Sequence, residues 1–422
     1  MTVAHQSTPL RQELSHLRAA AHLLNRTPAP KLNDCLLRLA DLTEENIPAL
    51  LQANQQDLSR MDPGNPKYDR LLLSEERLQS IANDLRRVAA LPSPLGKTLE
   101  DRTLANGLQL SRISVPIGVV GIVFESRPNV TFDVFALNLK AGNATVLKGS
   151  RDAADSNRAI KALIDRALAE TDLPPACYLA PPEREALLPI LTADGLLDLI
   201  IPRGSQGLID HVRAHATVPV IETGAGICHT YVDERANLKW AADIITNAKA
   251  RRVSVCNALD CLLLHHTQLP SLPLLLRELG EQHHCEVYAD EAAYAQLSGR
   301  YPEELLLHAT PDSFGTEFLR MALSVKVVED IDEAIAHVAQ YGSRHSESIV
   351  SEEPINQERY QREVDAAVVY VNTSTAFTDG GQFELGAEIG ISTQKLHARG
   401  PMGLAALTSY KWLVIGSGQV RI

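Results

Sequence analysis

Several features that would point to particular classes of protein are missing from the chain. Its 422 residues contain no Gly-x-Gly-x-x-Gly dinucleotide fingerprint and no Walker phosphate-binding sequence. No run of about 18 apolar residues that could span a membrane occurs. The first residues, Met1 to Arg11, lack the basic and apolar regions of a secretory signal. We therefore expect a cytoplasmic protein, and any dinucleotide site must be of a type without the glycine fingerprint.

Cysteine, aromatic residues and positive net charge are also scarce. The six cysteines are scattered, and no two have the two-residue separation of a metal knuckle or redox pair, so we expect reduced thiols and no metal site. Aromatic residues make up 5% of the chain, which suggests no stacking platform for bases. A formal charge of −12 repels nucleic acid on average, although it allows a local basic pocket for an anionic cofactor. We expect no binding to nucleic acid or membranes.

The composition is that of an ordinary globular protein, with 45% hydrophobic and 22% charged residues. The length exceeds what one hydrophobic core usually serves, so we expect two domains or one domain with large excursions. Residues 9–100 carry helical periodicity, interrupted by a loop at 61–66. We interpret these helices as scaffolding.

A hairpin signal follows. Asn106-Gly107 lies between two short alternating segments, which is typical of a tight β-turn. Residues 406–415, near the end of the chain, also predict a strand and are its natural partner. The two segments either pair within one subunit or extend a sheet across a subunit interface, which would hide exposed edges. We expect this arm to support a homodimer or homotetramer.

Strands and helices alternate regularly from residue 117, which predicts a parallel, doubly wound sheet. An apolar run at 117–124 is typical of a strand buried on both faces. Further strands are expected at 144–148, 197–201 and 218–221. After the strand expected at 259–265, the pattern restarts as a smaller α/β unit.

Two turns fit an anion site, because ligands of such sheets lie beyond the carboxyl ends of the strands, often against helix N-termini. Lys148-Gly149-Ser150 leaves a strand and enters a helix with a cation and a hydroxyl in place. Gly204-Ser205 does the same with two small residues that admit close approach. Glycine and serine also begin many ordinary helices, so each turn alone is a weak signal.

The loop Arg251-Arg-Val-Ser-Val-Cys-Asn-Ala258 carries the candidate nucleophile. A thiolate is a strong nucleophile, and cationic neighbours favour the ionised form of Cys256. The alternative is a packed core cysteine, since free cysteine is among the most buried residue types. Cys261 lies within a predicted strand and is more simply a core residue.

Three stretches resemble the aldehyde dehydrogenase superfamily and, within it, the gamma-glutamyl phosphate reductase family. They are Val115–Thr131, Asp332–Ile349 and Gly386–Gly403, the last reading Gly-Ala-Glu-Ile-Gly-Ile-Ser-Thr-Gln-Lys-Leu-His-Ala-Arg-Gly-Pro-Met-Gly. The resemblance covers the chain from residue 9 onward. It implies an α/β, aldehyde-dehydrogenase-like fold with a Rossmann-type nucleotide-binding domain, an α/β catalytic domain and a β-hairpin oligomerisation arm.

The resemblance also implies domain boundaries. We expect 1–102 and 117–250 in the nucleotide-binding domain, 251–371 in the catalytic domain, 372–401 in a segment returning to the nucleotide-binding domain, and 103–116 with 402–422 in the arm.

Individual positions match functional residues of the superfamily. Cys256 falls on the nucleophile, and Glu222 falls near the glutamate that activates water in hydrolytic relatives. The expected cofactor contacts are Lys148 and Ser150 for the adenosine ribose and 2′-phosphate, Gly204 and Ser205 for the diphosphate, and Glu317 for the nicotinamide ribose. Asn129 is the candidate amide donor to the oxyanion, and a plain turn residue after Pro128 is an equally open alternative.

The implied reaction is the NADPH-dependent reduction of L-glutamate 5-phosphate to L-glutamate 5-semialdehyde and phosphate through a cysteine thioester, the second step of proline biosynthesis from glutamate. Reduction needs no hydrolytic water, so a structural role for Glu222 stays open. The substrate amino and carboxylate groups need counter-charges; the candidate cations are Arg127, Lys395, His397 and Arg399. An unstable acyl phosphate would gain from direct transfer within a complex with a separate glutamate kinase.

Two other functions compete with this reading. One is a CoA-acylating or hydrolytic aldehyde dehydrogenase of the same fold. The other is a non-catalytic nucleotide-binding or assembly protein that keeps the fold, against which the retention of Cys256 in its loop argues.

Overall fold

A computed structural model describes residues 9–65 and 67–421. The chain forms two compact units: unit 1 spans Met1–Thr223, Glu384–Gly390 and Met402–Ile422, and unit 2 spans Gly224–Phe383 and Ile391–Pro401. Parts of the expected first domain (residues 1–8), of the expected loop (Pro66) and of the expected arm (Ile422) lie outside the described residues. Among the described helices, none combines the length and apolar character needed to cross a membrane.

Unit 1 begins with helices whose apolar faces are buried, as the periodicity predicts. They are α1 (Pro9–Leu24), α2 (Ala29–Glu45), α3 (Ile47–Leu58), α4 (Tyr68–Leu71) and α5 (Glu75–Ala90). The side chain of Ser74 caps α5 by accepting a hydrogen bond from the Arg77 N–H at 3.2 Å. The described part of the expected loop at 61–65 lies between α3 and α4.

Unit 1 also holds a four-stranded parallel sheet in the order β5-β4-β3-β6. Its strands are β3 (Val119–Phe124), β4 (Ala144–Lys148), β5 (Cys177–Leu179) and β6 (Leu199–Arg203), and its helices are α6 (Pro128–Lys140), α7 (Ala154–Glu170), α8 (Leu187–Leu191) and α9 (Gln206–His215). β3 is buried along its whole length. The strand expected at 218–221 is reduced to a single bridge between Ile200 and Val220. β5 is too short, at three residues, to give a periodic signal.

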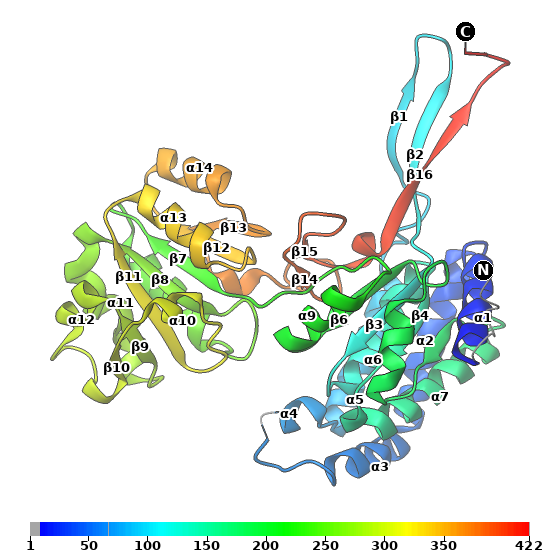
Figure 1. Ribbon diagram of the computed structural model, residues 1–422, viewed down its shortest axis with the longest axis horizontal. Coiled ribbons are helices and arrows are strands. Elements are labelled where there is room, and N and C mark those ends of the chain that lie inside the picture. Colours follow the sequence, from blue (N-terminus) through cyan, green and yellow to red (C-terminus); the bar gives the residue numbers. More distant parts are fainter. Residues whose placement is uncertain (1–8, 66, 422) are drawn as a thin grey trace, which may run out of the picture. The chain divides into compact units, whose positions relative to one another are not determined.

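The hairpin forms a separate antiparallel sheet in the order β1-β2-β16. β1 (Thr98–Thr103) and β2 (Gln109–Pro116) are joined by a turn in which Gly107 adopts a φ of 84°, a conformation that favours glycine. β16 (Thr408–Ile415) pairs with β2 along its whole length. Figure 1 shows β16, in red, beside the cyan hairpin. Of the two alternatives, pairing within one chain is confirmed.

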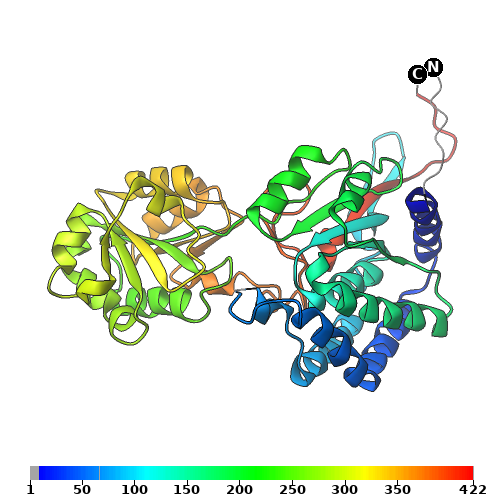
Figure 2. The same ribbon diagram turned by 60° about the horizontal axis from the view of Figure 1, so that its bottom comes forward.

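Unit 2 is built on a seven-stranded parallel sheet in the order β10-β9-β11-β8-β7-β12-β13. Its strands are β7 (Cys228–Val232), β8 (Leu259–His265), β9 (Glu286–Ala289), β10 (Leu306–His308), β11 (Ala322–Val328), β12 (Ser346–Val350) and β13 (Val368–Val371). Helices α10 (Leu238–Ala250), α11 (Leu272–Glu281) and α12 (Glu291–Leu297) pack on one face. Helices α13 (Ile331–Tyr341) and α14 (Pro354–Glu363) pack on the other, and Figure 2 shows the yellow strands between these two layers.

Short elements complete the chain. A two-stranded antiparallel pair, β14 (Ile391–Ser392) with β15 (Gly400–Pro401), belongs to unit 2. The 3-10 helices are η1 (Arg151–Ala153), η2 (Arg184–Ala186), η3 (His266–Ser271), η4 (Glu303–Leu305), η5 (Pro311–Gly315), η6 (Thr375–Phe377) and η7 (Leu404–Leu407).

The boundary between the units differs from the expected one. β7 and α10 were assigned to the first domain, but β7 pairs with β8 and β12 and α10 packs in the core of unit 2. The units therefore divide after Thr223, not at residue 250. The expected return segment also divides, since only Glu384–Gly390 of it belongs to unit 1. Strand alternation alone did not reveal this, because βα units look alike on both sides of the boundary.

Candidate active site

The loop of Cys256 connects α10 to β8 in unit 2. Cys256 is partly exposed, whereas Cys35, Cys177, Cys228, Cys261 and Cys285 are buried. Cys261 lies in β8 with no exposed surface, as the strand pattern predicted. Its partial exposure separates Cys256 from the core cysteines, which argues against the packed-core alternative for this residue.

Hydrogen bonds fix the backbone on both sides of the sulfur. The Cys228 thiol donates to the carbonyl of Cys256 at 3.2 Å. The Asn257 amide donates to the carbonyl of Thr378 at 3.0 Å and to that of Ala376 at 3.3 Å. The Thr375 hydroxyl donates to the Asn257 carbonyl at 2.8 Å. The loop is thereby tied to η6, a segment far away in the sequence.

The backbone of Gly226 packs directly against the Cys256 loop. A Cβ atom at this position would lie 1.6 Å from the carbonyl oxygen of Cys256, so no other residue fits without moving the loop. The Gly226 N–H donates to Oε1 of Glu317 at 3.0 Å. The structure thus brings the expected nucleophile and the expected nicotinamide-ribose contact to the same glycine.

A buried ion pair lies behind these residues. Lys249 Nζ and Asp260 Oδ1 are 3.2 Å apart, and the same carboxylate oxygen accepts the Phe318 N–H at 3.2 Å. Burial raises the pKa of Asp260 to about 6, against the opposing effect of Lys249. The pair anchors the start of β8 to the segment that carries Glu317.

In unit 1, Lys148 ends β4 beside a cavity of about 250 Å³. The cavity lies at the carboxyl ends of β4 and β5 and is lined by Gly149, Ser150, Ala154, Tyr178, Pro181 and Pro182, among others. The ammonium of Lys148 donates to the carbonyls of Gly149 at 3.0 Å and Pro182 at 3.2 Å. Burial lowers the pKa of Lys148. Both the cavity and the cation fit an anionic, partly aromatic ligand at this edge of the sheet.

The two candidate turns are tied to the segment that follows β3. The Ser150 hydroxyl accepts the Ser126 N–H at 3.2 Å. The carboxylate of Glu125 accepts both the N–H and the hydroxyl of Ser205 at 3.1 Å, and its carbons would lie 3.0 Å from a Cβ at Gly204. An internal carboxylate therefore occupies the position before α9 where the resemblance puts a diphosphate.

Asn129 lies in the first turn of α6, whose first residue is Pro128. Its amide donates to Asp133 Oδ2, one turn later, at 3.2 Å. Burial raises the pKa of Asp133 to about 6, although Arg203 and Asn129 act in the opposite direction. Asn129 is therefore a helical residue with a local partner, and not the plain turn residue of the open alternative.

Three of the remaining charged candidates, Glu222, Lys395 and Arg399, form ion pairs. Glu222 forms an ion pair with Arg213 at 3.3 Å. Lys395 and Arg399 both pair with Asp365, at 2.9 and 2.8 Å, and their hydrogen bonds lower the pKa of that carboxyl to about 2. This supports surface pairing for two of the four cations considered for the substrate.

The candidates fall into two groups. Unit 1 carries Asn129, Lys148, Ser150, Gly204, Ser205 and Glu222; unit 2 carries Cys256 and Glu317. Sequence reasoning missed Glu125, Gly226 and Asn257. Glu125 follows a buried strand directly, at the same sheet edge as Lys148, and that position was a usable signal. Gly226 and Asn257 act through contacts with distant segments, which no local pattern reveals.

Similar proteins agree with the fold and the reaction expected. A gamma-glutamyl phosphate reductase of Chlorobaculum parvum is 57% identical over 411 residues, covering 97% of this chain and 98% of that protein. The crystal structure of a gamma-glutamyl phosphate reductase from Thermotoga maritima is 40% identical, with a TM-score of 0.94 over 98% of this chain and 100% of that one. An acetylating aldehyde dehydrogenase from Geobacillus thermoglucosidasius shares the fold at 18% identity, with a TM-score of 0.68 over 98% of this chain and 97% of that one. No family model matches the chain.

Proposed function

The chain belongs to the gamma-glutamyl phosphate reductase family, and on this premise we propose that it reduces L-glutamate 5-phosphate to L-glutamate 5-semialdehyde through a thioester on Cys256, with NADPH as the reductant. The observation that carries the proposal is the full-length identity of 57% to a reductase of this name. The same identity favours this reaction, the second step of proline biosynthesis from glutamate, over a CoA-acylating or hydrolytic activity.

Cys256 is the proposed nucleophile. Its thiolate attacks the carbonyl carbon of the acyl phosphate, the carbon–oxygen bond to phosphate breaks, and inorganic phosphate leaves. Addition of a hydride to the thioester gives a hemithioacetal anion, which collapses to the aldehyde and returns the thiolate. Partial exposure of the sulfur and the fixed backbone around it support this role, because attack requires both access and orientation.

The tetrahedral stages need hydrogen-bond donors near the oxyanion. The backbone N–H of Cys256 and the amide of Asn129 are the proposed donors. Because that amide donates to Asp133 here, it has to exchange this partner for the oxyanion. If any residue of this chain activates water, Glu222 is the proposed one. Its ion pair with Arg213 fits a purely structural role equally well.

The nicotinamide cofactor is assigned to the sheet edge of unit 1. NADPH supplies the hydride when it is bound. Lys148 and Ser150 are proposed to hold the adenosine ribose and 2′-phosphate, since Ser150 lines a cavity of about 250 Å³ and Lys148, two residues earlier, provides a cation. Gly204 and Ser205 are proposed to receive the diphosphate once Glu125 withdraws. Glu317 is the proposed contact of the nicotinamide ribose. Unit 1 then serves as the nucleotide-binding domain and unit 2 as the catalytic domain.

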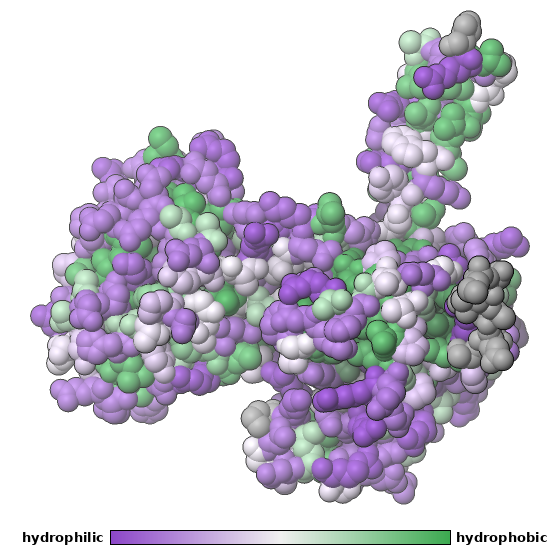
Figure 3. All heavy atoms as spheres, in the orientation of Figure 1, coloured by the Kyte–Doolittle hydropathy of each residue, from purple (hydrophilic) through white to green (hydrophobic). Residues whose placement is uncertain are grey.

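The arm is proposed to join subunits into a homodimer or homotetramer. β16 presents exposed apolar side chains, including Leu413 at 40%, Val414 at 58% and Ile415 at 64% exposure. Figure 3 shows apolar surface along the arm. Such a surface on an unpaired edge strand favours association with another copy. A cytoplasmic location and a complex with a separate glutamate kinase complete the proposal, and the six free thiols fit a reducing compartment.

A comparison of acyl acceptors tests the function. Oxidation of glutamate 5-semialdehyde by NADP is measured with phosphate, with CoA and with neither. We expect turnover with phosphate only. Turnover with CoA would identify an acylating dehydrogenase, and turnover with neither would identify a hydrolytic one. Nucleotide binding without turnover in any arm would indicate a non-catalytic protein.

A further inference from the structure

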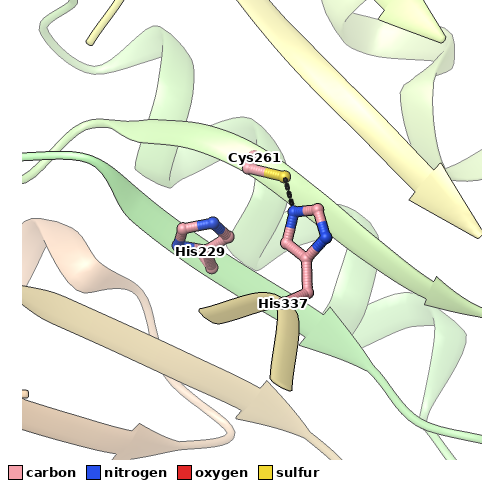
Figure 4. Close-up of side chains that lie close together, drawn as sticks. All are labelled: His229, Cys261 and His337. Atoms are coloured by element: carbon pink, nitrogen blue, oxygen red, sulfur yellow. Dashed lines mark hydrogen bonds between the residues drawn. The ribbon is translucent and has the colours of Figure 1, made fainter. Parts of the chain in front are cut away.

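Three side chains from different elements converge in the core of unit 2. They are His229 from β7, Cys261 from β8 and His337 from α13, and one potential ligand atom of each lies within 4.8 Å of the others. The exposed fractions of the three are 0%, 0% and 8%. Figure 4 shows the cysteine above the two rings, and its Sγ lies 3.7 Å from Nε2 of His337.

The sheet register builds this cluster. His229 lies directly opposite Cys261 on the neighbouring strand, so their side chains point to the same face. On the other side of His229, Glu347 of β12 occupies the matching position. Helix α13 packs on this face and brings His337 over the sulfur. Three adjacent strands and one helix therefore place polar groups together in an otherwise apolar layer.

Glu347 orients the first ring. Its Oε2 accepts the backbone N–H of His229 at 2.8 Å and lies 3.0 Å from Nδ1 of the same residue. A carboxylate partner fixes a ring proton on Nδ1, so a cation would bind at Nε2 by displacing any proton held there. This is the second layer that metal-binding histidines commonly have. Nε2 of His229 is buried and has no hydrogen-bond partner among the described residues.

Aromatic side chains cover the His337 side of the cluster. The rings of Phe314 and Tyr341 pack against His337, with centroids 5.2 and 4.6 Å from its own. A buried nitrogen without a partner costs free energy in such a setting. A cation held by both rings and the sulfur would remove that cost.

We propose that His229 Nε2, Cys261 Sγ and His337 Nε2 bind a zinc ion, with a water molecule in the fourth tetrahedral position. Two imidazole nitrogens and a thiolate are donors that zinc accepts, and its bond lengths of about 2.0 to 2.3 Å at tetrahedral angles put sulfur and nitrogen about 3.6 Å apart. The observed separation of Sγ and His337 Nε2 is 3.7 Å. The other separations within the cluster are no larger than 4.8 Å, so binding the ion would draw these atoms closer together.

The ion links β7, β8 and α13, so its role is to stabilise unit 2. It takes no part in the proposed reaction, and the inference stands independently of the proposed function. It departs from the sequence-based expectation of no metal, which considered closely spaced cysteines only. The three ligands lie on different elements and share no local spacing.

Metal content tests the inference on the complete, untagged chain. The protein is produced in zinc-supplemented medium, dialysed without chelator and measured by elemental mass spectrometry. We expect one zinc ion per chain, and a lower melting temperature after removal of the ion by a chelator. A zinc-free protein that also fails to take up Zn²⁺ on titration would overturn the proposal.

Variants locate the ion. Cys261→Ser and His337→Gln are expected to lose zinc, whereas Cys285→Ser, a buried cysteine of the same unit, and Cys256→Ser are expected to keep it. Retention in Cys261→Ser or loss in Cys256→Ser would contradict the assignment. Replacement of zinc by Co²⁺ in the unmodified chain gives a readout that needs no variant. Sulfur-to-cobalt charge-transfer absorption supports the site, and a bound cobalt without it refutes thiolate ligation.

Discussion

The candidate groups of the two units are prepared for their tasks in different ways. In unit 1, Lys148 donates to two carbonyls, Ser205 binds Glu125 and Asn129 binds Asp133. Each of these groups is hydrogen-bonded to an oxygen of the protein itself, and its proposed ligand would have to take the place of that oxygen. In unit 2, the bonds on either side of Cys256 run through its carbonyl and through Asn257, and they fix the loop while the residue stays partly exposed.

This difference suggests two energetic regimes. Binding at the edge of the unit 1 sheet exchanges internal hydrogen bonds for ligand bonds, so substitutions there should alter affinity. The loop of unit 2 is organised in advance, so substitutions there should alter the rate of the chemical step.

The largest effect is expected for Cys256→Ser. A serine hydroxyl is a weak nucleophile without an adjacent base, so kcat should fall on the order of 10³-fold or more. NADPH affinity, measured by fluorescence titration, should stay unchanged, because the cofactor contacts are assigned to other residues. Near-normal turnover would remove Cys256 from the chemistry.

Gly226→Ala should come next. The added Cβ would lie 1.6 Å from the Cys256 carbonyl oxygen, so the loop must shift. A displacement of about 1 Å near the reacting atoms costs roughly 10²-fold in kcat. The matched control is Gly315→Ala in the same unit, where a Cβ would meet only Tyr341 at 3.6 Å. Equal kcat values for the two variants would show that the loop position is unimportant.

Glu125→Gln should have a smaller effect, and it should improve NADPH binding instead of impairing the enzyme. It removes a negative charge from the turn proposed to receive the diphosphate, so the Kd for NADPH should fall several-fold. The gain should shrink as salt is added, because salt screens the repulsion. Weaker binding in this variant would instead show that Glu125 is needed to shape the Gly204-Ser205 turn.

The smallest effect concerns Asp133. Its folded pKa of about 6 lies above the ordinary value of 3.8, so the native state holds the proton more tightly. This carboxyl should therefore lower the free energy of unfolding as the pH rises from about 4 to about 6. Asp133→Asn should flatten the curve in this window, as measured by urea denaturation at several pH values. If Asp133→Asn left the curve unchanged, the pH dependence of the free energy of unfolding would come from other groups.

Much of the architecture could be predicted from local pattern. The strands at 144–148 and 259–265 have the bounds that the sequence pattern predicts. The unit boundary could not be predicted, because it depends on β7 pairing with β8 and β12. A three-residue strand such as β5 carries too few residues for any period to show.

The same distinction holds for the candidate site, where residues could be predicted but their contacts could not. Residue type and resemblance picked out Cys256 and Lys148, but neither could indicate what those groups contact. Glu125 at Ser205 and Gly226 against Cys256 are partners brought close by tertiary packing. Asp133 becomes the partner of Asn129 because both lie in α6, one helical turn apart. The cluster of His229, Cys261 and His337 was invisible for the same reason, since strand register aligns its members.

Acyl transfer to Cys256 can be measured directly by mixing the enzyme with glutamate 5-semialdehyde and NADP in the absence of phosphate. We predict a burst of one NADPH per chain, a glutamyl adduct on the peptide that contains Cys256, and steady turnover when phosphate is added. Steady turnover without phosphate, or an adduct on any other residue, would contradict the account.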